Sequence, residues 1–297
     1  MADGLSAMAL GAIARQLHGT DREAPPEPLD VGFSSVVVAF GASVVRVART
    51  EQAREGHERE MTLLPWLDGR LGVDLPVPRA LLAPSPALPF GAIVQTRLQG
   101  RVMTAADGRA GDTATKFGDV LARLHGVDPA EAPAGSVQHL DPTAYLHRIQ
   151  RETRACLRTR ISSHEQARLD ARLRDAEELL PGHEQVLCHG DAWYGNALVD
   201  DDGHLAALLD FEDACLADPA LDLAATMYLD PPGPERVLDA YLYEHRPSRS
   251  LLARIEAYTL VRELAGLAYL LRNDIDEELE DGIEKVRAAL GVRPTRR

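Results

Sequence analysis

Three oxygen-bearing side chains, Asp191, Asn196 and Asp210, are spaced along one short segment in a way that could support phosphoryl transfer. In the segment VLCHGDAWYGNALVDDDGHLAALLDFED, residues 186–213, Asp191 precedes Asn196 by five residues and Asp210 ends an apolar run. One carboxylate can accept the proton of an attacking hydroxyl. An amide oxygen and a second carboxylate can hold Mg²⁺, a hard cation that prefers oxygen ligands, against a nucleoside triphosphate. The spacing therefore indicates a magnesium-dependent kinase reaction.

Short strands around a loop would bring these three residues together. Val186–Cys188 and Ala197–Val199 are expected to be strands, and the apolar run that ends at Asp210 is expected to be a third. The three side chains would then lie in loops or at strand ends, where functional groups can converge. Asp and Asn are also common turn residues, but the joint pattern favours function over a turn.

The first hundred residues predict a strand-rich lobe. After a short amphipathic helix and a Pro- and acid-rich connector at 20–30, β-branched runs at 36–40 and 44–48 form a strand–turn–strand pattern, and 91–98 is a further strand. Residues 51–67 have helical spacing, with Glu60 on the apolar face and Pro65 expected to end or kink the helix. We expect a five-stranded antiparallel sheet plus a helix within residues 1–98.

From residue 99 onward the pattern becomes mainly helical. Apolar positions recur at helical spacing in 112–128, 142–160 and 163–180, and in three segments that close the chain. We expect a helical lobe over residues 99–297 that carries the catalytic loop and the substrate site. Together the two parts predict an α+β, two-lobed fold.

Composition limits the partners of the protein. A formal net charge of −14 argues against a nucleic-acid partner, which needs clustered Lys and Arg, and is compatible with a cationic small molecule. The three cysteines show no paired spacing that would indicate a zinc site or a disulfide framework. No apolar run approaches the length of a membrane span, so we expect a cytoplasmic monomer or dimer without a membrane partner.

The motif set resembles the aminoglycoside phosphotransferase and choline kinase family, which is distantly related to protein kinases. His189-Gly190-Asp191 with Asn196, and Asp210-Phe211 followed by DPALDLA, carry the resemblance. It extends to REMTLLPWL, VQTRLQG and LARLHGVD, and covers about residues 30–275. The resemblance implies a bilobal protein-kinase-like fold, Mg²⁺ as cofactor, and ATP or GTP as donor of a phosphate to a hydroxyl of a small molecule.

The resemblance also implies roles for residues of the catalytic loop. Asp191 would be the catalytic base, and Asn196 and Asp210 would be the magnesium ligands. His189 would orient the loop, and Asp222 would anchor it through backbone amides. For His189 and Asp222, a structural role as satisfied core polar residues is the favoured alternative.

The phosphate grip is expected to depend on an arginine. Kinase-like folds pair a strand Lys with a helix Glu to hold the phosphates, but no lysine precedes Lys116 in this chain. Arg46 falls at the strand position and Glu60 is its expected partner. The alternative is an exposed Arg46 that pairs with any of Glu55, Glu58 or Glu60.

Four further residues are candidates for nucleotide contacts. The phosphate loop VGFSSV has a single glycine, and Ser34 could supply a donor to the phosphates. By resemblance, Thr96 and Leu98 align with the hinge that meets the adenine edge, and Gln95 stands at the back of that pocket.

Acidic residues are expected to hold a cationic substrate. Seven acids and no base lie between residues 274 and 284. An exposed carboxylate–ammonium contact is worth only about 1 kcal/mol in water, so several must act together. The alternative is a solvated acidic helix face. The candidates are Glu212, Asp213, Asp274, Glu277 and Glu278.

The expected activity is antibiotic resistance by phosphorylation, with an aminoglycoside or another basic antibiotic as acceptor. A macrolide or a tuberactinomycin peptide comes next, and choline or homoserine metabolism is possible. A catalytically silent kinase-like binding protein is an alternative of another class, although the base and both metal positions are intact. A metal-dependent hydrolase is a further alternative, but His183 and His204 lack convincing ligand spacing.

Overall fold

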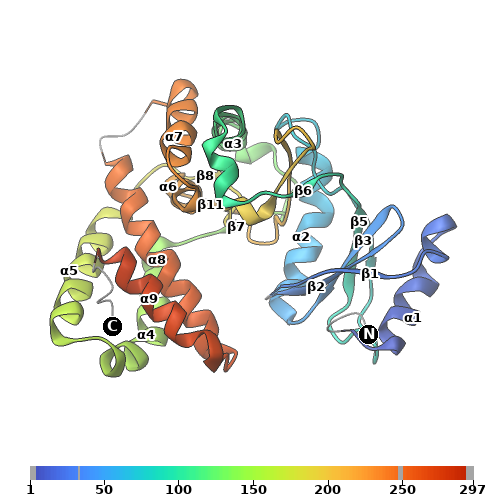
Figure 1. Ribbon diagram of the computed structural model, residues 1–297, viewed down its shortest axis with the longest axis horizontal. Helices are drawn as coiled ribbons and strands as arrows, with labels where there is room; N and C mark the ends of the chain where they lie inside the picture. Colours follow the sequence, from blue (N-terminus) through green and yellow to red (C-terminus); the bar gives the residue numbers. More distant parts are fainter. Residues whose placement is uncertain (1–4, 33, 247–249, 292–297) are drawn as a thin grey trace.

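A five-stranded antiparallel sheet organises the first hundred residues in the computed structural model, which describes residues 5–32, 34–246 and 250–291 (Figure 1). The strand order is β1-β2-β3-β5-β4, and every neighbouring pair is antiparallel. The edge strand β1 lies inside the segment that the sequence presents as a connector. The strands are β1 Glu27–Val31, β2 Ser35–Phe40, β3 Ser43–Ala48, β4 Pro78–Leu82 and β5 Ala92–Thr96.

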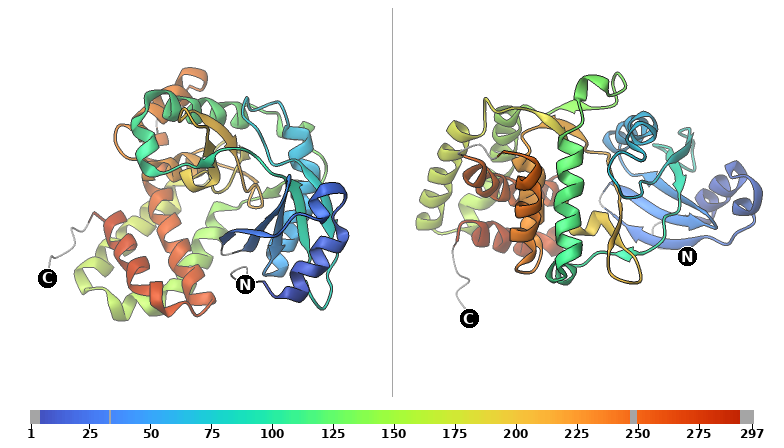
Figure 2. Two further views of the ribbon diagram at one scale, coloured as in Figure 1. Left: turned by 45° about the vertical axis from the view of Figure 1, so that its right-hand side comes forward. Right: turned by 90° about the horizontal axis from the view of Figure 1, so that it is seen from above.

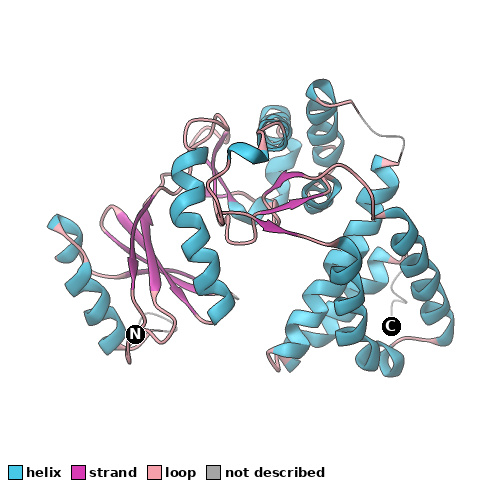
Figure 3. Cartoon of the chain, turned by 180° about the vertical axis from the view of Figure 1, so that it is seen from behind, coloured by secondary structure: helices cyan, strands magenta, loops and turns pink. Residues whose placement is uncertain are grey.

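Two helices cover the two faces of this sheet, as Figure 3 shows from behind. Helix α1, Ala7–Gln16, buries Ile13 in a cluster with Val38 and Phe40 of β2. Helix α2, Glu51–Leu67, begins at Thr50, whose hydroxyl accepts from the Ala53 backbone. It continues for two residues beyond Pro65, so the proline does not end it. The buried positions of α2 include Glu60, whose carboxylate faces Arg46 of β3.

The rest of the chain is mainly helical (Figures 1 and 2). Helices α3 and α7 pack side by side. Helices α4, α5 and α9 form a second group around the long helix α8. The α-helices are α3 Gly111–His125, α4 Pro142–Arg160, α5 Ser163–Leu179, α6 Ala220–Ala225, α7 Gly233–Glu244, α8 Leu251–Arg272 and α9 Leu279–Ala289. Short 3₁₀ turns lie at Gly19–Arg22, Ala105–Arg109, Pro129–Glu131, Tyr194–Asn196, Thr226–Tyr228 and Asp276–Glu278.

Two small sheets lie between the strand-rich part and the helices. One has the order β10-β9-β6 and the other β7-β11-β8. The loop 189–196 therefore leaves one sheet at β8 and enters the other at β9, while residue 210 follows β10. The strands are β6 Arg101–Val102, β7 Gln138–His139, β8 Val186–Cys188, β9 Ala197–Val199, β10 Leu205–Leu208 and β11 Cys215–Ala217.

This arrangement confirms the predicted α+β class with a strand-rich first part and a helical second part. The three strands expected around the catalytic loop are all present as β8, β9 and β10. Within the described residues, no helix combines the length and the apolar character that crossing a membrane requires.

Candidate active site

The loop that follows β8 is anchored by a buried carboxylate on α6. The backbone N–H groups of His189 and Gly190 donate to the two oxygens of Asp222 at 2.7 Å and 2.9 Å. Asp222 is fully buried. The backbone contacts expected of Asp222 are thus present, and they fix the start of the loop before Asp191.

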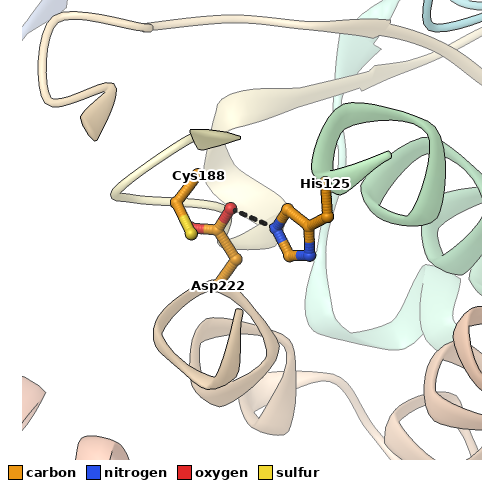
Figure 4. A group of neighbouring side chains, drawn as sticks. All are labelled: His125, Cys188 and Asp222. Atoms are coloured by element: carbon orange, nitrogen blue, oxygen red, sulfur yellow. Dashed lines mark hydrogen bonds and ion pairs between the residues drawn. The ribbon is translucent and has the colours of Figure 1, made fainter. Parts of the chain in front are cut away.

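Asp222 is in turn held by the side chain of His125 on α3 (Figure 4). The Nε2 atom of His125 lies 3.0 Å from Asp222, and its Nδ1 atom lies 3.0 Å from the Tyr241 hydroxyl. Burial alone would raise the pKa of Asp222, but the hydrogen bonds from His125 and the His189 backbone hold it below its ordinary value. Cys188 completes the cluster, with its thiol facing backbone carbonyls. Because Asp222 accepts from two backbone N–H groups of the loop and is bound by His125, this cluster anchors the loop.

His189 connects the segment of Asp191 with the segment of Asp210. Its Nδ1 atom accepts from the Asp191 backbone at 3.2 Å, and its Nε2 atom lies 2.8 Å from the Leu209 carbonyl. Its ring packs against Phe211, with the ring centroids 4.4 Å apart. His189 is completely buried, and its contacts join the backbone at Asp191 to the backbone at Leu209.

Hydrogen bonds of Asn196 join Asp191 to the segment that leads into Asp210. The side-chain amide nitrogen of Asn196 donates to a carboxylate oxygen of Asp191 at 3.0 Å, and the backbone carbonyl of Asn196 accepts from the Leu209 backbone N–H at 2.7 Å. Since the Asn196 nitrogen is used to hold Asp191, the amide oxygen is the atom left to bind a cation. Amide and carboxylate oxygens from Asn196 and Asp210 form a donor set that suits Mg²⁺.

Arg46 of β3 reaches across to Asp210. Its Nη1 atom donates to both oxygens of Glu60 at 2.8 Å, and its Nη2 atom binds Asp210 and, at 2.6 Å, Glu212. Burial alone would lower the pKa of Arg46, but these three carboxylates outweigh it and raise the pKa above its ordinary value. The predicted pairing of Arg46 with Glu60 is present, and it is buried rather than exposed.

Glu60 joins three segments of the chain. Besides Arg46, its carboxylate accepts from the Phe211 backbone at 2.8 Å and from the Gln95 amide at 3.2 Å. The side chain has no solvent exposure. Glu60 therefore couples the sheet, through Arg46 and Gln95, to the residue that follows Asp210.

The other candidate nucleotide residues lie around this network. Ser34 lies close to the Glu212 carboxylate and opposes the rise of its pKa. The Thr96 hydroxyl accepts from the Val77 backbone at 2.9 Å, and Leu98 is half-buried in the segment after β5. Their contacts with a nucleotide remain predictions.

Glu212 and Asp213, both proposed from the sequence as substrate ligands, have different surroundings. The Glu212 carboxylate faces Arg46 and lies 3.9 Å from His57. Burial and the neighbouring Asp210 raise its pKa to about 8. Its contacts thus favour the nucleotide side over a substrate ammonium. Asp213 is exposed, although surrounding protein atoms and the charges of Asp210 and Asp191 raise its pKa to about 6.

Arg262 of α8 is a site residue that the sequence did not reveal. Its Nη2 atom forms a 2.6 Å ion pair with Asp191, and its guanidinium lies over the ring of Tyr228, 5.6 Å from the centroid. The residue lies on a helix far along the chain from Asp191, and no motif marks it. The sequence offered no signal for this contact.

The acids of the run that the sequence proposes as substrate ligands lie past the C-terminal end of α8. Asp274, Glu277 and Glu278 are exposed in the turn between α8 and α9. The ten helical steps of α8 from Arg262 to Arg272 span about 15 Å, and this turn lies beyond them. Three other acids of the run pair within the protein, namely Glu280 with Arg160, Asp281 with Lys285 and Glu284 with Arg287. Binding of an acceptor by Asp274, Glu277 or Glu278 remains a prediction.

The two histidines considered as hydrolase ligands lie elsewhere. His183 contacts the Leu179 carbonyl at 2.9 Å, and His204 faces Asp200 at 3.6 Å. Neither contact involves Asp191 or Asp210, so the structure gives no support to a metal-dependent hydrolase built on them.

One known protein family matches most of the chain. The model described as "Phosphotransferase enzyme family" matches residues 25–258. The chain also resembles macrolide 2'-phosphotransferase MphH from Brachybacterium faecium, with 26% identity and a TM-score of 0.70 over 97% of this chain and 99% of that one.

Two further solved structures share the fold at lower identity. The GDP and kanamycin complex of APH(2")-IIia is 17% identical, with a TM-score of 0.78 over 90% of this chain and 93% of that chain. Macrolide 2'-phosphotransferase type I is 20% identical, with a TM-score of 0.70 over 94% and 95% of the two chains. These similarities confirm the predicted kinase-like fold class.

Proposed function

The chain belongs to the phosphotransferase enzyme family, and from this premise we propose that it moves the γ-phosphoryl group of ATP or GTP to a hydroxyl of a small cationic antibiotic. It is a phosphotransferase with a hydroxyl as acceptor. The observation that carries the proposal is the convergence of Asp191, Asn196 and the Asp210 segment through the hydrogen bonds of Asn196.

In the proposed reaction, Asp191 is the catalytic base. The acceptor oxygen bonds to the γ-phosphorus as the bond from that phosphorus to the bridging oxygen breaks, and the nucleoside diphosphate leaves. The hydroxyl proton passes to the Asp191 carboxylate. Asn196 keeps that carboxylate in position from one side, and Asp222 fixes the loop through His189 and Gly190.

Asn196 and Asp210 would hold the magnesium ion, whose charge, when it is bound, offsets the charge of the phosphates. Arg46 would contact the phosphates from the sheet. Its guanidinium already lies against Asp210, so nucleotide and metal would enter beside a cation that Glu60 fixes in place. Gln95 orients Glu60 from behind. Ser34, Thr96 and Leu98 would complete the nucleotide contacts.

An aminoglycoside or another basic antibiotic is the proposed acceptor. Asp213 offers an exposed carboxylate close enough to Asp191 for their charges to interact, and the net charge of −14 favours a cationic ligand. A relative with this fold forms a complex with kanamycin. A macrolide is the second candidate, because the 26% identity to a macrolide 2'-phosphotransferase exceeds the 17% identity to the kanamycin-bound relative.

A coupled nucleotide-consumption assay tests the function. Mg²⁺-ATP and Mg²⁺-GTP are supplied in turn with kanamycin, a macrolide, a tuberactinomycin peptide, choline and homoserine, and product masses are measured. Consumption stimulated by one acceptor, with a product heavier by one phosphate, supports the proposal. Nucleotide binding without turnover on any acceptor would favour the catalytically silent binding protein instead.

A further inference from the structure

Both carboxylate oxygens of Asp191 are engaged in the structure. One accepts from the Asn196 amide at 3.0 Å, and the other forms the 2.6 Å ion pair with Arg262. An acceptor hydroxyl that hydrogen-bonds Asp191 must therefore do so next to the Arg262 guanidinium. Arg262 is thus a cation in direct contact with the proposed catalytic base.

Tyr228 packs against the guanidinium of Arg262. One face lies over the Tyr228 ring, and the Tyr228 hydroxyl is bound by Glu263, the next residue of α8. The Arg262 side chain is 28% exposed, so solvent reaches only part of it. A guanidinium has several N–H donors and no acceptor, and it can bind Asp191 and a ligand oxygen together.

A carboxylate, Asp213, also lies close enough to Asp191 for their charges to interact. Asp213 follows the Asp210 segment and is exposed. Tyr145 of α4 experiences both charges, since its pKa is raised to about 12 mainly by burial and further by Asp213, while Arg262 opposes the shift. The site is thus positive beside Asp191 at Arg262 and negative at Asp213.

We propose that Arg262 determines which hydroxyl is phosphorylated, by requiring an oxygen-bearing neighbour rather than an ammonium beside the reacting group. This inference rests on the proposed function. The acceptor presents a hydroxyl, ether or carbonyl oxygen to Arg262 and places its ammonium groups toward Asp213. Arg262 is then a specificity-determining residue of the acceptor site.

The physical reason is like-charge repulsion at short range. A hydroxyl within hydrogen-bond distance of Asp191 places the substituents of the adjacent ring carbons roughly 4–5 Å from the guanidinium, given the ion-pair distance. An ammonium at that separation in a partly exposed cleft lowers reaction at that hydroxyl by a factor of roughly ten. An oxygen at the same place can accept from Arg262 instead.

The test uses the position of phosphorylation on kanamycin, which has hydroxyls with only oxygen-bearing neighbours and others next to an amine. The whole protein and its Arg262→Leu, Arg262→Lys and Arg272→Leu variants are given Mg²⁺-nucleotide, and the products are assigned by mass and NMR. We expect the unaltered protein to phosphorylate an oxygen-flanked hydroxyl. Arg262→Leu should raise the share of amine-flanked product roughly tenfold.

The two other variants distinguish the effect of the Arg262 charge from a nonspecific effect of substitution in α8. Arg262→Lys keeps the cation and should keep the product position at a lower rate, whereas Arg272→Leu removes a cation from the far end of α8 and should change neither. Amine-flanked product from the unaltered protein, or the same product ratio in Arg262→Leu, would overturn the inference while leaving the function intact. No phosphorylation of kanamycin or any other tested antibiotic would overturn the proposed function and the inference with it.

Discussion

Arg46 and Glu60 form a buried ion pair in which one guanidinium nitrogen lies 2.8 Å from both carboxylate oxygens. The Arg46 side chain is 8% exposed and the Glu60 side chain is not exposed at all. Because Glu60 also binds the Phe211 backbone, the pair links the sheet to the segment of the proposed metal ligand. The pair should therefore contribute to stability and hold Arg46 in position for the phosphates.

Removal of Glu60 should destabilise the protein strongly. Glu60→Ala takes one of three carboxylates from the buried Arg46 and leaves the Phe211 backbone N–H without its acceptor. Breaking a buried ion pair costs up to about 3–5 kcal/mol. Urea denaturation followed by circular dichroism measures the loss. Glu58→Ala breaks an exposed pair on the same helix and should cost under about 1 kcal/mol. Equal losses in the two variants would contradict the special position of Glu60.

Substitution of Asp191 should remove the chemical step and spare nucleotide binding. Asp191→Ala deletes the proton acceptor, so turnover should fall roughly a hundred- to ten-thousandfold. Calorimetric titration with Mg²⁺-nucleotide should give a dissociation constant close to that of the unaltered protein. Asp201→Ala, in the exposed turn after β9, is the matched control. Turnover of Asp191→Ala equal to that control would rule out Asp191 as the base.

Asp210 should be required for metal-dependent nucleotide binding. Asp210→Ala removes a carboxylate oxygen from the proposed Mg²⁺ site and leaves Arg46 paired with Glu60 and Glu212. Nucleotide affinity should then no longer respond to added Mg²⁺ or EDTA, whereas Asp213→Ala should keep the response. An unchanged magnesium dependence in Asp210→Ala would remove Asp210 from the metal site.

The sequence predicted the parts of the site that depend on local spacing. Asp191, Asn196 and Asp210 lie within one segment, so the strand–loop–strand pattern was enough to bring them together. The pairing of Arg46 with Glu60 was also accessible, because a charged residue on an otherwise apolar helix face needs a partner.

The contacts that the sequence did not reveal join residues far apart in the chain. Arg262 meets Asp191 only because α8 packs behind the catalytic loop, and nothing near Arg262 in the sequence indicates this. The acidic run at 274–284 suggested a clamp by its composition. Asp274, Glu277 and Glu278 lie in the turn after α8, and their contact with an acceptor stays a prediction. Glu212 was assigned to the substrate for its place after Asp210, and the sequence did not show that its carboxylate pairs with Arg46.

His57 should make the stability of the protein sensitive to acid. Burial, and then the charge of Arg46, lower the pKa of His57 to about 3, whereas an unfolded chain protonates histidine near 6.5. Its contribution is therefore complete above pH 6.5 and is lost as the pH falls toward 3. Between pH 7.5 and pH 5 the unaltered protein should lose about 2 kcal/mol more of its unfolding free energy than His57→Gln. Urea titrations at both pH values measure this, and equal losses would refute it.

Gly190 and Gly203 share a backbone conformation, but only Gly190 is tightly packed. Alanine at each position therefore separates the cost of a steric clash from the cost of backbone strain. Gly190 and Gly203 have nearly the same positive φ, 88° and 87°. A Cβ on Gly190 would lie 2.2 Å from the Asp213 carbonyl oxygen, whereas a Cβ on Gly203 meets no atom within 4 Å. Gly203→Ala should cost only the left-handed conformation, about 1 kcal/mol.

Gly190→Ala should cost the same strain and also displace the loop from Asp213. The clash is with backbone, which no side-chain rotation relieves, so we expect a loss of stability at least about 2 kcal/mol greater than for Gly203→Ala. The displacement also draws the Gly190 N–H away from Asp222, so turnover should fall in this variant alone. Unfolding free energies and turnover, measured side by side, test this. Matching values for the two alanine variants would show that the loop can retreat from Asp213 without losing the geometry of Asp191.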